Sequence, residues 1–244
     1  MHGTAGMTRV IKVGGRPQRD PALTAVLADA HRNAPGSIVI VHGGGDEVSA
    51  LQRLHGVAAQ FSGGRRVTNV ADLEILRMAL SGSANKRLVA SLNDQGAAAV
   101  GLSGEDGGLL RATPLDRALY GFVGTPSGVG VALLRQLLDG GYLPVLSPLS
   151  RSDDPESGAT LNVNGDDAAA AIAIALGAEE LLLVSDVPGV LVDGVPAVLL
   201  GPDDVRRLVD DGTASGGMEA KLQAALTALA GGVTRVRISD IAAI

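Results

Sequence analysis

Three glycine-rich turns follow short apolar segments in the first half of the chain, and their residue types suit the binding of anions. The turns are Lys12-Val13-Gly14-Gly15, His42-Gly43-Gly44-Gly45 and Leu102-Ser103-Gly104. Glycine lets backbone N–H groups approach an anion closely, and a helix that starts after the turn adds a favourable dipole. A single turn of this kind is as consistent with a tight connection, but three together favour an anion-binding site.

The spacing of the glycines excludes several familiar motifs. The chain contains no G-x-x-x-x-G-K-[ST] sequence, so it is not a P-loop enzyme. The pairs Gly43-x-Gly45 and Gly128-x-Gly130 lack the third glycine of a dinucleotide-binding fingerprint. There is no G-x-S-x-G elbow, and the histidines do not have the spacing of metal ligands.

The elements that must position these turns alternate between short apolar and longer amphipathic segments. Strands are predicted at 10–13, 37–41, 98–102, 143–146, 181–184 and 235–238. Helices are predicted at 22–32, 46–54, 72–80, 84–93, 131–138, 166–176, 202–209 and 218–229, with Gly96 and Gly177 as helix stops. The alternation indicates an α/β fold of βαβ units, in which ligands bind at the carboxyl ends of the strands. The polar segment 150–158 is predicted to be a surface hairpin, with a linker as the alternative.

Composition excludes other classes of protein. Twenty Lys and Arg against twenty-six Asp and Glu give a net charge of −6, and only four residues are aromatic. Both facts argue against a nucleic-acid partner. The longest apolar run, residues 168–178, is shorter than the ~20 residues of a membrane span. The N-terminus lacks the apolar core of a secretory leader. A soluble cytoplasmic protein is therefore expected, with Met7 as a candidate natural start.

Several motifs resemble those of the amino-acid kinase family. They are Lys12-Val-Gly-Gly, His42-Gly-Gly-Gly, Gly64-Arg-Arg66-Val-Thr68, Asn162-Val-Asn-Gly-Asp166, Leu181-Leu-Leu-Val-Ser-Asp186-Val-Pro-Gly and Gly216-Gly-Met-Glu-Ala-Lys221. The matches run in order from about residue 9 to 240. Within the family the motifs are most similar to those of the N-acetylglutamate kinases of arginine biosynthesis.

This resemblance implies an open, mainly parallel three-layer αβα sandwich. It implies transfer of a phosphoryl group from MgATP to the side-chain carboxylate of N-acetyl-L-glutamate, giving an acyl phosphate. An acyl-amino-acid-binding lobe is expected over 1–178 and a nucleotide-binding lobe over 179–244, sharing one sheet. Because a carboxylate acceptor is already ionised at pH 7, the reaction needs no base. It needs fixed cations and N–H groups that hold two anions in line.

The resemblance also assigns roles to particular residues. Lys12 and Lys221 resemble the lysines that face the transferring phosphoryl and the leaving side. Asp166 resembles the carboxylate that organises both lysines, although at the start of a helix it would also serve as a cap. For the acceptor, the resemblance implies N–H groups of Gly44 and Gly45, together with Arg66 on the α-carboxylate and Asn162 on the amide and carboxylate. Arg65 competes with Arg66 for its role.

The nucleotide is expected to contact two glycines after the first strand and two later segments. These residues are Gly14, Gly15, Ser185, Asp186, Val187, Gly189, Val190, Leu191, Thr213 and Ser215. Mg²⁺ is expected to arrive with the ATP phosphates, so no residue is assigned as a metal ligand.

Two positions depart from the family pattern. Glu105 stands where the family usually has lysine, which reverses the local charge. Gly165 stands where the acetylglutamate kinases usually have alanine, whereas kinases of carrier-bound aminoadipate or glutamate often have glycine. Those kinases therefore remain an alternative, although the net charge of −6 argues against docking of an acidic carrier.

The ends of the chain lead to two more expectations. After Ile238 the family usually continues with a further helix and strand, whereas this sequence ends at Ile244. Arginine-inhibited members carry an extra N-terminal helix that links dimers into hexamers, and only eleven residues precede Lys12. An arginine-insensitive homodimer is expected. A different class of function, a non-catalytic amino-acid or nucleotide sensor on the same fold, stays open, although such a protein would be expected to lose Lys12, Asp166 or Lys221.

Overall fold

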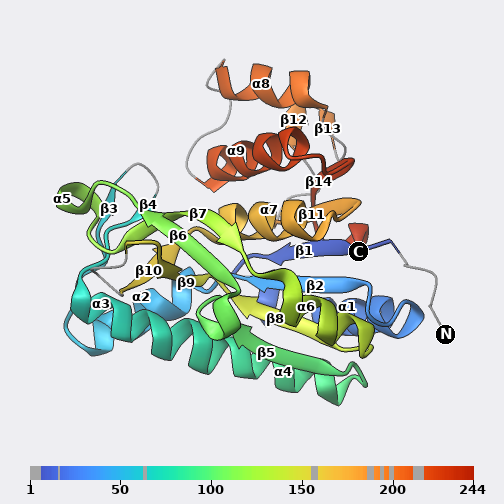
Figure 1. Cartoon of the computed structure of the whole chain (residues 1–244), viewed down its shortest axis with the longest axis horizontal. Helices are drawn as coiled ribbons and strands as arrows, with labels where there is room; N and C mark the ends of the chain where they lie inside the picture. The colour runs from blue at the N-terminus through green and yellow to red at the C-terminus, as the bar shows by residue number, and fades with distance from the viewer. Residues whose placement is uncertain are drawn as a thin grey trace.

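A central sheet of six parallel strands runs through the molecule, in the order β14-β11-β1-β2-β8-β5 (Figure 1). The structure is a computed structural model that describes residues 7–15, 17–62, 65–154, 159–185, 190–192, 195–197, 201–210 and 217–244. The strands are β1 (Arg9–Val13), β2 (Ile38–His42), β5 (Ala99–Ser103), β8 (Leu143–Ser147), β11 (Glu180–Val184) and β14 (Arg235–Ser239). All six lie where the sequence predicts strands.

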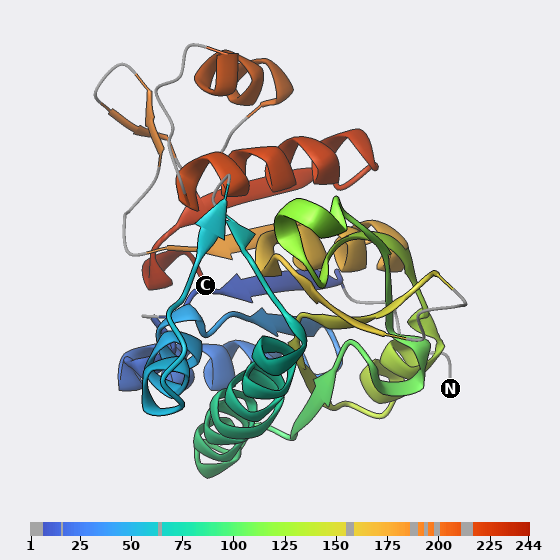
Figure 2. The same cartoon turned by 90° about the vertical axis from the view of Figure 1, so that its left-hand side faces the viewer.

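Helices cover both faces of this sheet, which makes the predicted three-layer sandwich (Figure 2). Helices α1 (Pro21–Asn33) and α4 (Asn85–Asp94) pack on one face, and α6 (Val131–Asp139), α7 (Gly165–Leu176) and α9 (Gly217–Ala230) pack on the other. Because side chains alternate along a strand, Ile11 and Val13 face α1, whereas Val10 faces α7. The same alternation directs Lys12, at the end of β1, toward the α7 face.

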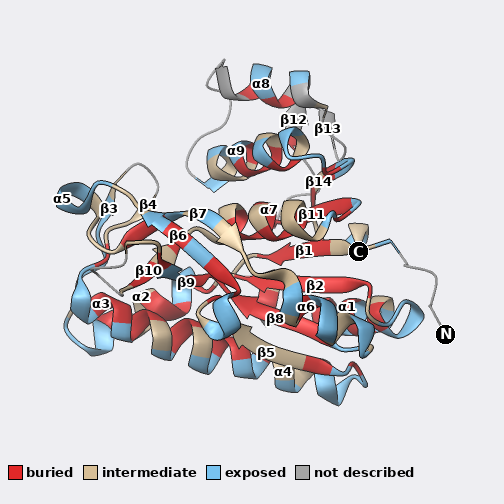
Figure 3. Ribbon diagram, viewed as in Figure 1, coloured by how far each residue is buried: buried red, intermediate tan, exposed pale blue. Residues whose placement is uncertain are grey.

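Most residues of the inner strands of the sheet are buried, edge strand β5 is largely intermediate, and the outward faces of the helices are exposed (Figure 3). The core between them is aliphatic, as a sequence with four aromatic residues requires. The predicted helix stops are confirmed, because Gly96 and Gly177 have φ of +80° and +65°. None of the described helices has the length and apolar content that crossing a bilayer would need.

The two helices predicted at 72–80 and 84–93 form one continuous helical stretch. Its parts are α3 (Val70–Leu76), the π-helical segment η2 (Arg77–Ala84) and α4. The predicted break at 81–83 is therefore wrong, since Ser81, Gly82 and Ser83 are accommodated in the wider π turn instead of ending the helix. The stretch begins at a capping box in which Asn69 and Asp72 exchange hydrogen bonds.

Four short strands that were not predicted as such form a small closed barrel beside the sheet. They are β6 (Leu110–Pro114), β7 (Val123–Val129), β9 (Leu149–Ser152) and β10 (Thr160–Val163). Strands β9 and β10 do form the predicted hairpin, with residues 155–158 outside the described part of the chain. Within the predicted segment Arg151 is exposed and Asp153 and Asp154 are half-buried, whereas Ser150 and Ser152 are buried, so the predicted surface position is confirmed only in part.

The remaining elements are short. Helix α2 (Gly45–Leu54) follows β2, and the hairpin of β3 (Phe61–Ser62) and β4 (Arg65–Arg66) stands out before α3 (Figure 2). Helix α5 (Arg117–Tyr120) precedes β7. The last elements are the hairpin of β12 (Val190–Val192) and β13 (Val195–Ala197), helix α8 (Pro202–Asp210) and the 3-10 turn η4 (Ile241–Ala243).

Candidate active site

The carboxyl ends of β1 and β2 meet the first turn of α7, and a pocket of about 230 Å³ opens there. Parallel strands direct their carboxyl ends to one edge, so residues far apart in sequence gather at this place. Seven of the predicted site residues meet here. Six of them line the pocket, namely Lys12, Gly44, Gly45, Arg66, Asn162 and Asp166, and Lys221 contacts Asp166.

Two lysines converge on one buried carboxylate at the pocket. Lys12 Nζ lies 2.9 Å from Asp166 Oδ1, as an ion pair rather than a well-directed hydrogen bond. Lys221 Nζ, from α9, donates a hydrogen bond to Asp166 Oδ2 at 3.3 Å. The three side chains are between 6% and 13% exposed, so solvent screens these charges little. The structure thus brings Lys12, Asp166 and Lys221 together at one place.

Asp166 is free to contact the lysines because another residue caps its helix. The side chain of Asn164 accepts the hydrogen bond from Asp166 N at 2.7 Å, which makes Asn164 the N-cap of α7. The alternative in which Asp166 itself caps the helix is therefore wrong.

The electrostatics keep the carboxylate charged. Burial raises the pKa of Asp166, but the charges of Lys12 and Lys221 outweigh burial and hold this pKa below its usual value. Burial lowers the pKa of Lys221, as does the nearby charge of Lys12, while Asp166 opposes both. A further anion at this place would relieve the repulsion between the two ammonium groups.

Glycines bring the backbone close to its neighbours at the pocket. An added Cβ at Gly44 would lie 2.7 Å from Leu80 Cδ2, and one at Gly165 would lie 3.3 Å from Lys12 Cε. Gly15 packs against the next turn, since its added Cβ would be 3.6 Å from both Gly44 Cα and Gly45 N. Helix α2 begins at Gly45, so its first N–H groups point toward this edge without partners within the helix.

Arg66 forms one wall of the pocket and is held by several contacts. Its guanidinium donates hydrogen bonds to Gly45 O at 3.1 Å, to Ser49 Oγ at 2.9 Å and to Gln52 Oε1. It also stacks on the Phe61 ring, with Cζ 4.7 Å from the ring centroid. Burial lowers the pKa of Arg66 and the charge of Asp72 raises it.

Asn162 and Arg65 also line the pocket. Asn162 Nδ2 donates to Thr68 Oγ1 at 3.1 Å. Arg65 Nη2 lies 2.9 Å from Asp167 Oδ2 and so links the β3–β4 hairpin to α7. Arg65 also lines a second cavity, of about 540 Å³, between β7, α7 and α9.

His42 shapes the glycine turn rather than titrating in it. Burial lowers the pKa of His42 to about 4, so the imidazole is neutral at pH 7. Asn85 Nδ2 lies 3.0 Å from His42 Nε2, and His42 Nδ1 lies 2.8 Å from Gly43 O. Since the amide donates to Nε2, the proton sits on Nδ1 and is donated to the Gly43 carbonyl. The sequence analysis excluded His42 as a metal ligand, together with the other histidines, and gave its side chain no other role.

The charge reversal at Glu105 is compensated within the fold. Arg77 Nη2 and Nε donate to the Glu105 carboxylate at 3.0 and 3.3 Å, and Thr160 Oγ1 donates to it as well. Hydrogen bonding to Glu105 raises the pKa of Arg77. Glu105 does not line the 230 Å³ pocket, so the reversed sign is neutralised outside it.

The residues predicted to contact the nucleotide are only partly described. Gly14 and Gly15 follow β1, and Ser185 follows β11, where its N–H donates to Ser239 O at 2.7 Å. Val190, which is buried, and Leu191 belong to β12. The other predicted residues, Asp186, Val187, Gly189, Thr213 and Ser215, lie outside the described residues. Within the described chain, no three His, Asp or Glu side chains are grouped as a metal would require.

Sequence reasoning missed two polar residues behind Arg66. Gln52 and Asp72 are 1% and 4% exposed, and neither was singled out. A signal existed for Gln52: it follows Val48 by four residues, so a polar side chain falls on the buried stripe of α2.

Comparison of the sequence with known proteins identifies the family of this chain. Residues 7–240 match the amino acid kinase family. A relative from Geobacillus kaustophilus (strain HTA426), named acetylglutamate kinase, is 43% identical over 235 residues, covering 96% of this chain and 90% of the relative. A relative of the same name from Roseiflexus sp. (strain RS-1) is 43% identical over 236 residues, covering 96% and 89%. The chain belongs to the amino acid kinase family.

Solved structures share the fold. The smu.665 protein from Streptococcus mutans UA159 has a TM-score of 0.85 and 30% identity, covering 96% of this chain and 94% of that one. N-acetylglutamate synthase from Neisseria gonorrhoeae, complexed with coenzyme A and N-acetyl-glutamate, has a TM-score of 0.81 and 27% identity, covering 98% of this chain and 55% of that one. Carbamate kinase from Giardia lamblia, 14% identical with a TM-score of 0.73, shares the fold alone.

Proposed function

We propose that this chain is an acetylglutamate kinase. It transfers the γ-phosphoryl group of ATP to the side-chain carboxylate of N-acetyl-L-glutamate, which gives N-acetyl-L-glutamyl 5-phosphate and ADP in arginine biosynthesis. The observation that carries the proposal is the pair of lysines on one buried carboxylate, at a pocket whose wall is an arginine. The acetylglutamate kinases that match over 96% of the chain support the same reaction.

The chemistry calls for charge neutralisation rather than proton transfer. The acceptor carboxylate, already ionised, attacks the γ-phosphorus while the bond to the β-γ bridging oxygen breaks. In this proposal Lys12 stabilises the transferring phosphoryl group and Lys221 stabilises the charge that develops on the leaving ADP. Asp166 holds both ammonium groups at a fixed separation. It acts through the two lysines and does not contact the reacting atoms itself. Preorganised charges of this kind need little rearrangement as the reaction proceeds.

The acceptor is held by its other polar groups. In this proposal the Arg66 guanidinium binds the α-carboxylate, a pairing of charges that suits arginine. Asn162 binds the acetamido group and the carboxylate, and the N–H groups of Gly44 and Gly45 donate to the reacting carboxylate. These four residues line one pocket with Lys12, which supports the assignment.

The nucleotide belongs to the other part of the chain. We propose that residues 179–244 form the nucleotide-binding lobe and 1–178 the acyl-amino-acid-binding lobe, as the family resemblance implies. Gly14, Gly15, Ser185, Val190 and Leu191 are proposed to contact ATP, together with residues outside the described part: Asp186, Val187, Gly189, Thr213 and Ser215. Mg²⁺ is proposed to stay with the phosphates, where it would neutralise their charge.

One observation favours a second candidate, a kinase of carrier-bound aminoadipate or glutamate. Gly165, a pocket residue typical of that branch, leaves room beside Lys12, where an alanine Cβ would lie 3.3 Å from Lys12 Cε. A glycine at position 165 is also compatible with the first candidate, because it leaves the position of Lys12 unchanged. The acceptor must therefore be decided by assay.

Assembly and regulation are also part of the proposal. We propose a cytoplasmic homodimer that arginine does not inhibit. Size-exclusion chromatography with light scattering is expected to give twice the mass of 24.5 kDa. A hexamer, or inhibition of turnover by arginine, would contradict this part of the proposal.

The test of the proposed reaction is an acceptor comparison. ADP release from MgATP and trapping of the acyl phosphate by hydroxylamine would be measured with N-acetyl-L-glutamate, L-glutamate, N-acetyl-L-aspartate and L-α-aminoadipate. Hydroxamate from N-acetyl-L-glutamate alone is the expected result. Turnover of none of the four, with turnover of a carrier-bound acceptor, would move the protein to the second candidate. Turnover of no acceptor at all would support a sensor.

A further inference from the structure

A chain of buried polar contacts lies behind Arg66, on the side away from the pocket. It runs from Arg66 Nη1 to Gln52 Oε1, and from Gln52 Nε2 to Asp72 Oδ1 at 2.6 Å. Asp72 Oδ2 in turn accepts a hydrogen bond from Asn69 N at 3.0 Å. Arg66 belongs to the β3–β4 hairpin, Gln52 to the end of α2 and Asp72 to the start of α3. Three separate elements are therefore linked through the side chain of Gln52.

The orientation of the Gln52 amide is fixed by its two partners. An ionised carboxylate only accepts hydrogen bonds, so the NH₂ group of Gln52 must face Asp72. The amide oxygen is then left to face Arg66, which only donates. If the Gln52 amide were turned by 180°, its NH₂ group would face the N–H donors of Arg66 and its oxygen would face the oxygen of Asp72. Neither hydrogen bond could then form. Gln52 is 1% exposed, so no water competes for either contact.

Helix capping alone does not account for Asp72. The capping box with Asn69 uses Asp72 Oδ2 and leaves Oδ1 to Gln52. A carboxylate that only caps a helix keeps its second oxygen in water, whereas Asp72 is 4% exposed. Burying a charge is costly unless a partner compensates for it. Arg66 supplies that compensation through Gln52, and the charge of Asp72 acts on Arg66 across the amide.

We infer that Gln52 and Asp72 are positioning residues that set the plane of the Arg66 guanidinium, and thereby the preference of the pocket for an acceptor with an α-carboxylate. The inference rests on the proposed function. In this arrangement Gln52 Oε1, Ser49 Oγ and Gly45 O hold the guanidinium nitrogens from behind. The directions of the remaining N–H groups of Arg66 are then fixed by the plane of its guanidinium. Neither Gln52 nor Asp72 lines the pocket, so both act through Arg66.

The test uses Gln52→Met, which keeps the length of the side chain and removes both hydrogen bonds, and Asp72→Asn, which keeps its shape. An asparagine has one acceptor oxygen for two donors, Gln52 Nε2 and Asn69 N, so one contact must fail. The control is Asn69→Ala, which removes the other half of the same capping box and leaves the Asn69 N–H in place for Asp72. The control separates helix stability from the positioning of Arg66.

The readout is the acceptor KM, measured with N-acetyl-L-glutamate and with 4-acetamidobutyrate, which has the reacting carboxylate but no α-carboxylate. Both relay variants are expected to raise KM for N-acetyl-L-glutamate on the order of tenfold, since each weakens a hydrogen bond to a charged group. The KM for ATP and for 4-acetamidobutyrate is expected to stay within about twofold. Asn69→Ala is expected to leave all KM values unchanged.

The double variant Gln52→Met/Asp72→Asn provides a further readout. Because the two residues act as one relay, its KM is expected to be no higher than that of the more impaired single variant. Circular dichroism would confirm that each variant is folded.

Two failures are distinguishable. If the unaltered protein phosphorylates no acceptor, the proposed function is wrong. If it phosphorylates N-acetyl-L-glutamate but the relay variants retain its KM, or lose activity toward both acceptors equally, the positioning role is wrong.

Discussion

Asp166 is the residue on which the charge balance of the pocket depends. It sits between two ammonium groups, and each ion pair compensates part of the cost of burying the other charges. The same carboxylate is therefore a structural and a functional residue. The two roles can be separated, because stability and turnover are measured independently.

Replacing Asp166 with asparagine leaves Lys12 and Lys221 close together without a counter-charge. Removing one partner of a buried ion pair costs about 3–5 kcal/mol, so a loss of that order in the free energy of unfolding is expected for Asp166→Asn. Lys221→Met is expected to cost less, since Asp166 keeps Lys12. Urea unfolding at pH 7 measures both. An Asp166→Asn protein as stable as the unaltered one would contradict this charge balance.

His42 makes a second prediction at this scale. Its pKa is about 4 in the folded protein against 6.5 for an unperturbed histidine, so the unfolded chain binds the proton first as the pH falls. The stability that neutral His42 contributes is complete above pH 6.5 and is lost as the pH falls toward 4. Relative to a His42→Gln variant, the free energy of unfolding is expected to drop by about 1.4 kcal/mol per pH unit in this window. A difference that does not change with pH would contradict the burial of a neutral imidazole.

Some of these residues could be predicted from the sequence and others could not. Lys12, Asp166 and Lys221 stand in motifs at predicted strand ends and helix starts, and the topology brings such positions to one edge. Gln52 and Asp72 stand in no motif, and their partner lies on a hairpin of two-residue strands. The pairing of Glu105 with Arg77 joins residues 28 positions apart through a π-helical segment that the sequence did not indicate.

At the scale of elements, the β3–β4 hairpin carries Arg66 but has few contacts of its own. Its strands pair through two residues each, and an ion pair between Arg65 and Asp167 ties it to α7. Burial raises the pKa of Asp167, and Arg65 opposes this effect. The hairpin is thus held through two neighbouring residues of β4, with Arg66 bound to the Gln52 relay and Arg65 to Asp167.

Replacing Asp167 with asparagine should loosen the hairpin without disturbing the sheet. Trypsin cleaves after arginine, so faster cleavage after Arg65 and Arg66 is expected in Asp167→Asn, because local opening becomes easier. Asp153→Asn is the matched control, since it removes the ion pair of Arg111 elsewhere on the surface. Equal cleavage rates in Asp167→Asn and in the control would contradict the role of the Arg65 contact.

The elements of the sheet were predictable because each is a short segment that contains Val, Leu or Ile and ends at or just before a glycine or serine. The small barrel was not, because strand β7 has the sequence V-G-T-P-S-G-V, which reads as a loop. In the structure Gly124 is required by packing, since an added Cβ would lie 2.8 Å from Leu161 Cδ1. Tertiary packing overrides local propensity at this strand.

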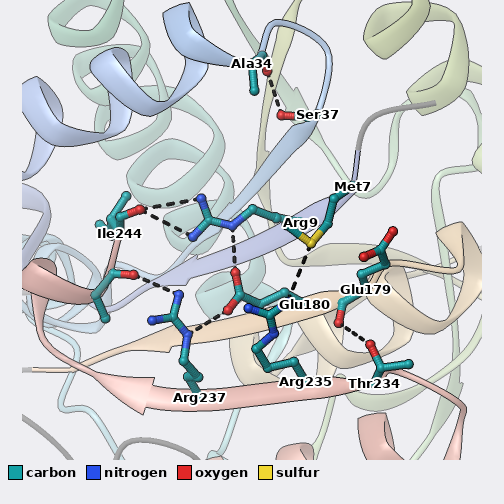
Figure 4. A network of polar contacts seen from close by, with 11 residues as sticks. Met7, Arg9, Ala34, Ser37, Glu179, Glu180, Thr234, Arg235, Arg237 and Ile244 are labelled. Carbon is teal, nitrogen blue, oxygen red and sulfur yellow. Dashed lines mark hydrogen bonds and ion pairs between the residues drawn. The ribbon is translucent and has the colours of Figure 1, made fainter. Parts of the chain in front are cut away.

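At the scale of the whole molecule, Glu180 joins the two ends of the chain to the sheet. Its carboxylate accepts from Arg9 Nε at 2.7 Å and from Arg237 Nε at 2.6 Å (Figure 4). The same two arginines donate to the carbonyl oxygens of Ile244 and Ala243. Strands β1, β11 and β14 and the C-terminal turn are therefore fixed to one another by a single buried carboxylate.

This network predicts a pH dependence of stability. Burial raises the pKa of Glu180, but the hydrogen bonds and charges of Arg237 and Arg9 outweigh it and lower the pKa. The stability contributed by ionised Glu180 is then complete above the unfolded value of about 4.3 and is lost as the pH falls through the lower folded value. Glu180→Gln is expected to cost about 3 kcal/mol at pH 7 and progressively less below pH 4. A cost that grows on acidification would contradict the sign of the pKa shift.

The central claim is that Lys12 and Lys221 act on a phosphoryl group passing from ATP to N-acetyl-L-glutamate. The most direct measurement is hydroxamate formation by the unaltered protein and by Lys12→Met and Lys221→Met, with folding checked by circular dichroism. The expected result is hydroxamate from the unaltered protein and a loss of at least about 100-fold in kcat for each folded variant. Full turnover by either folded variant, or no hydroxamate from the unaltered protein, would contradict the claim.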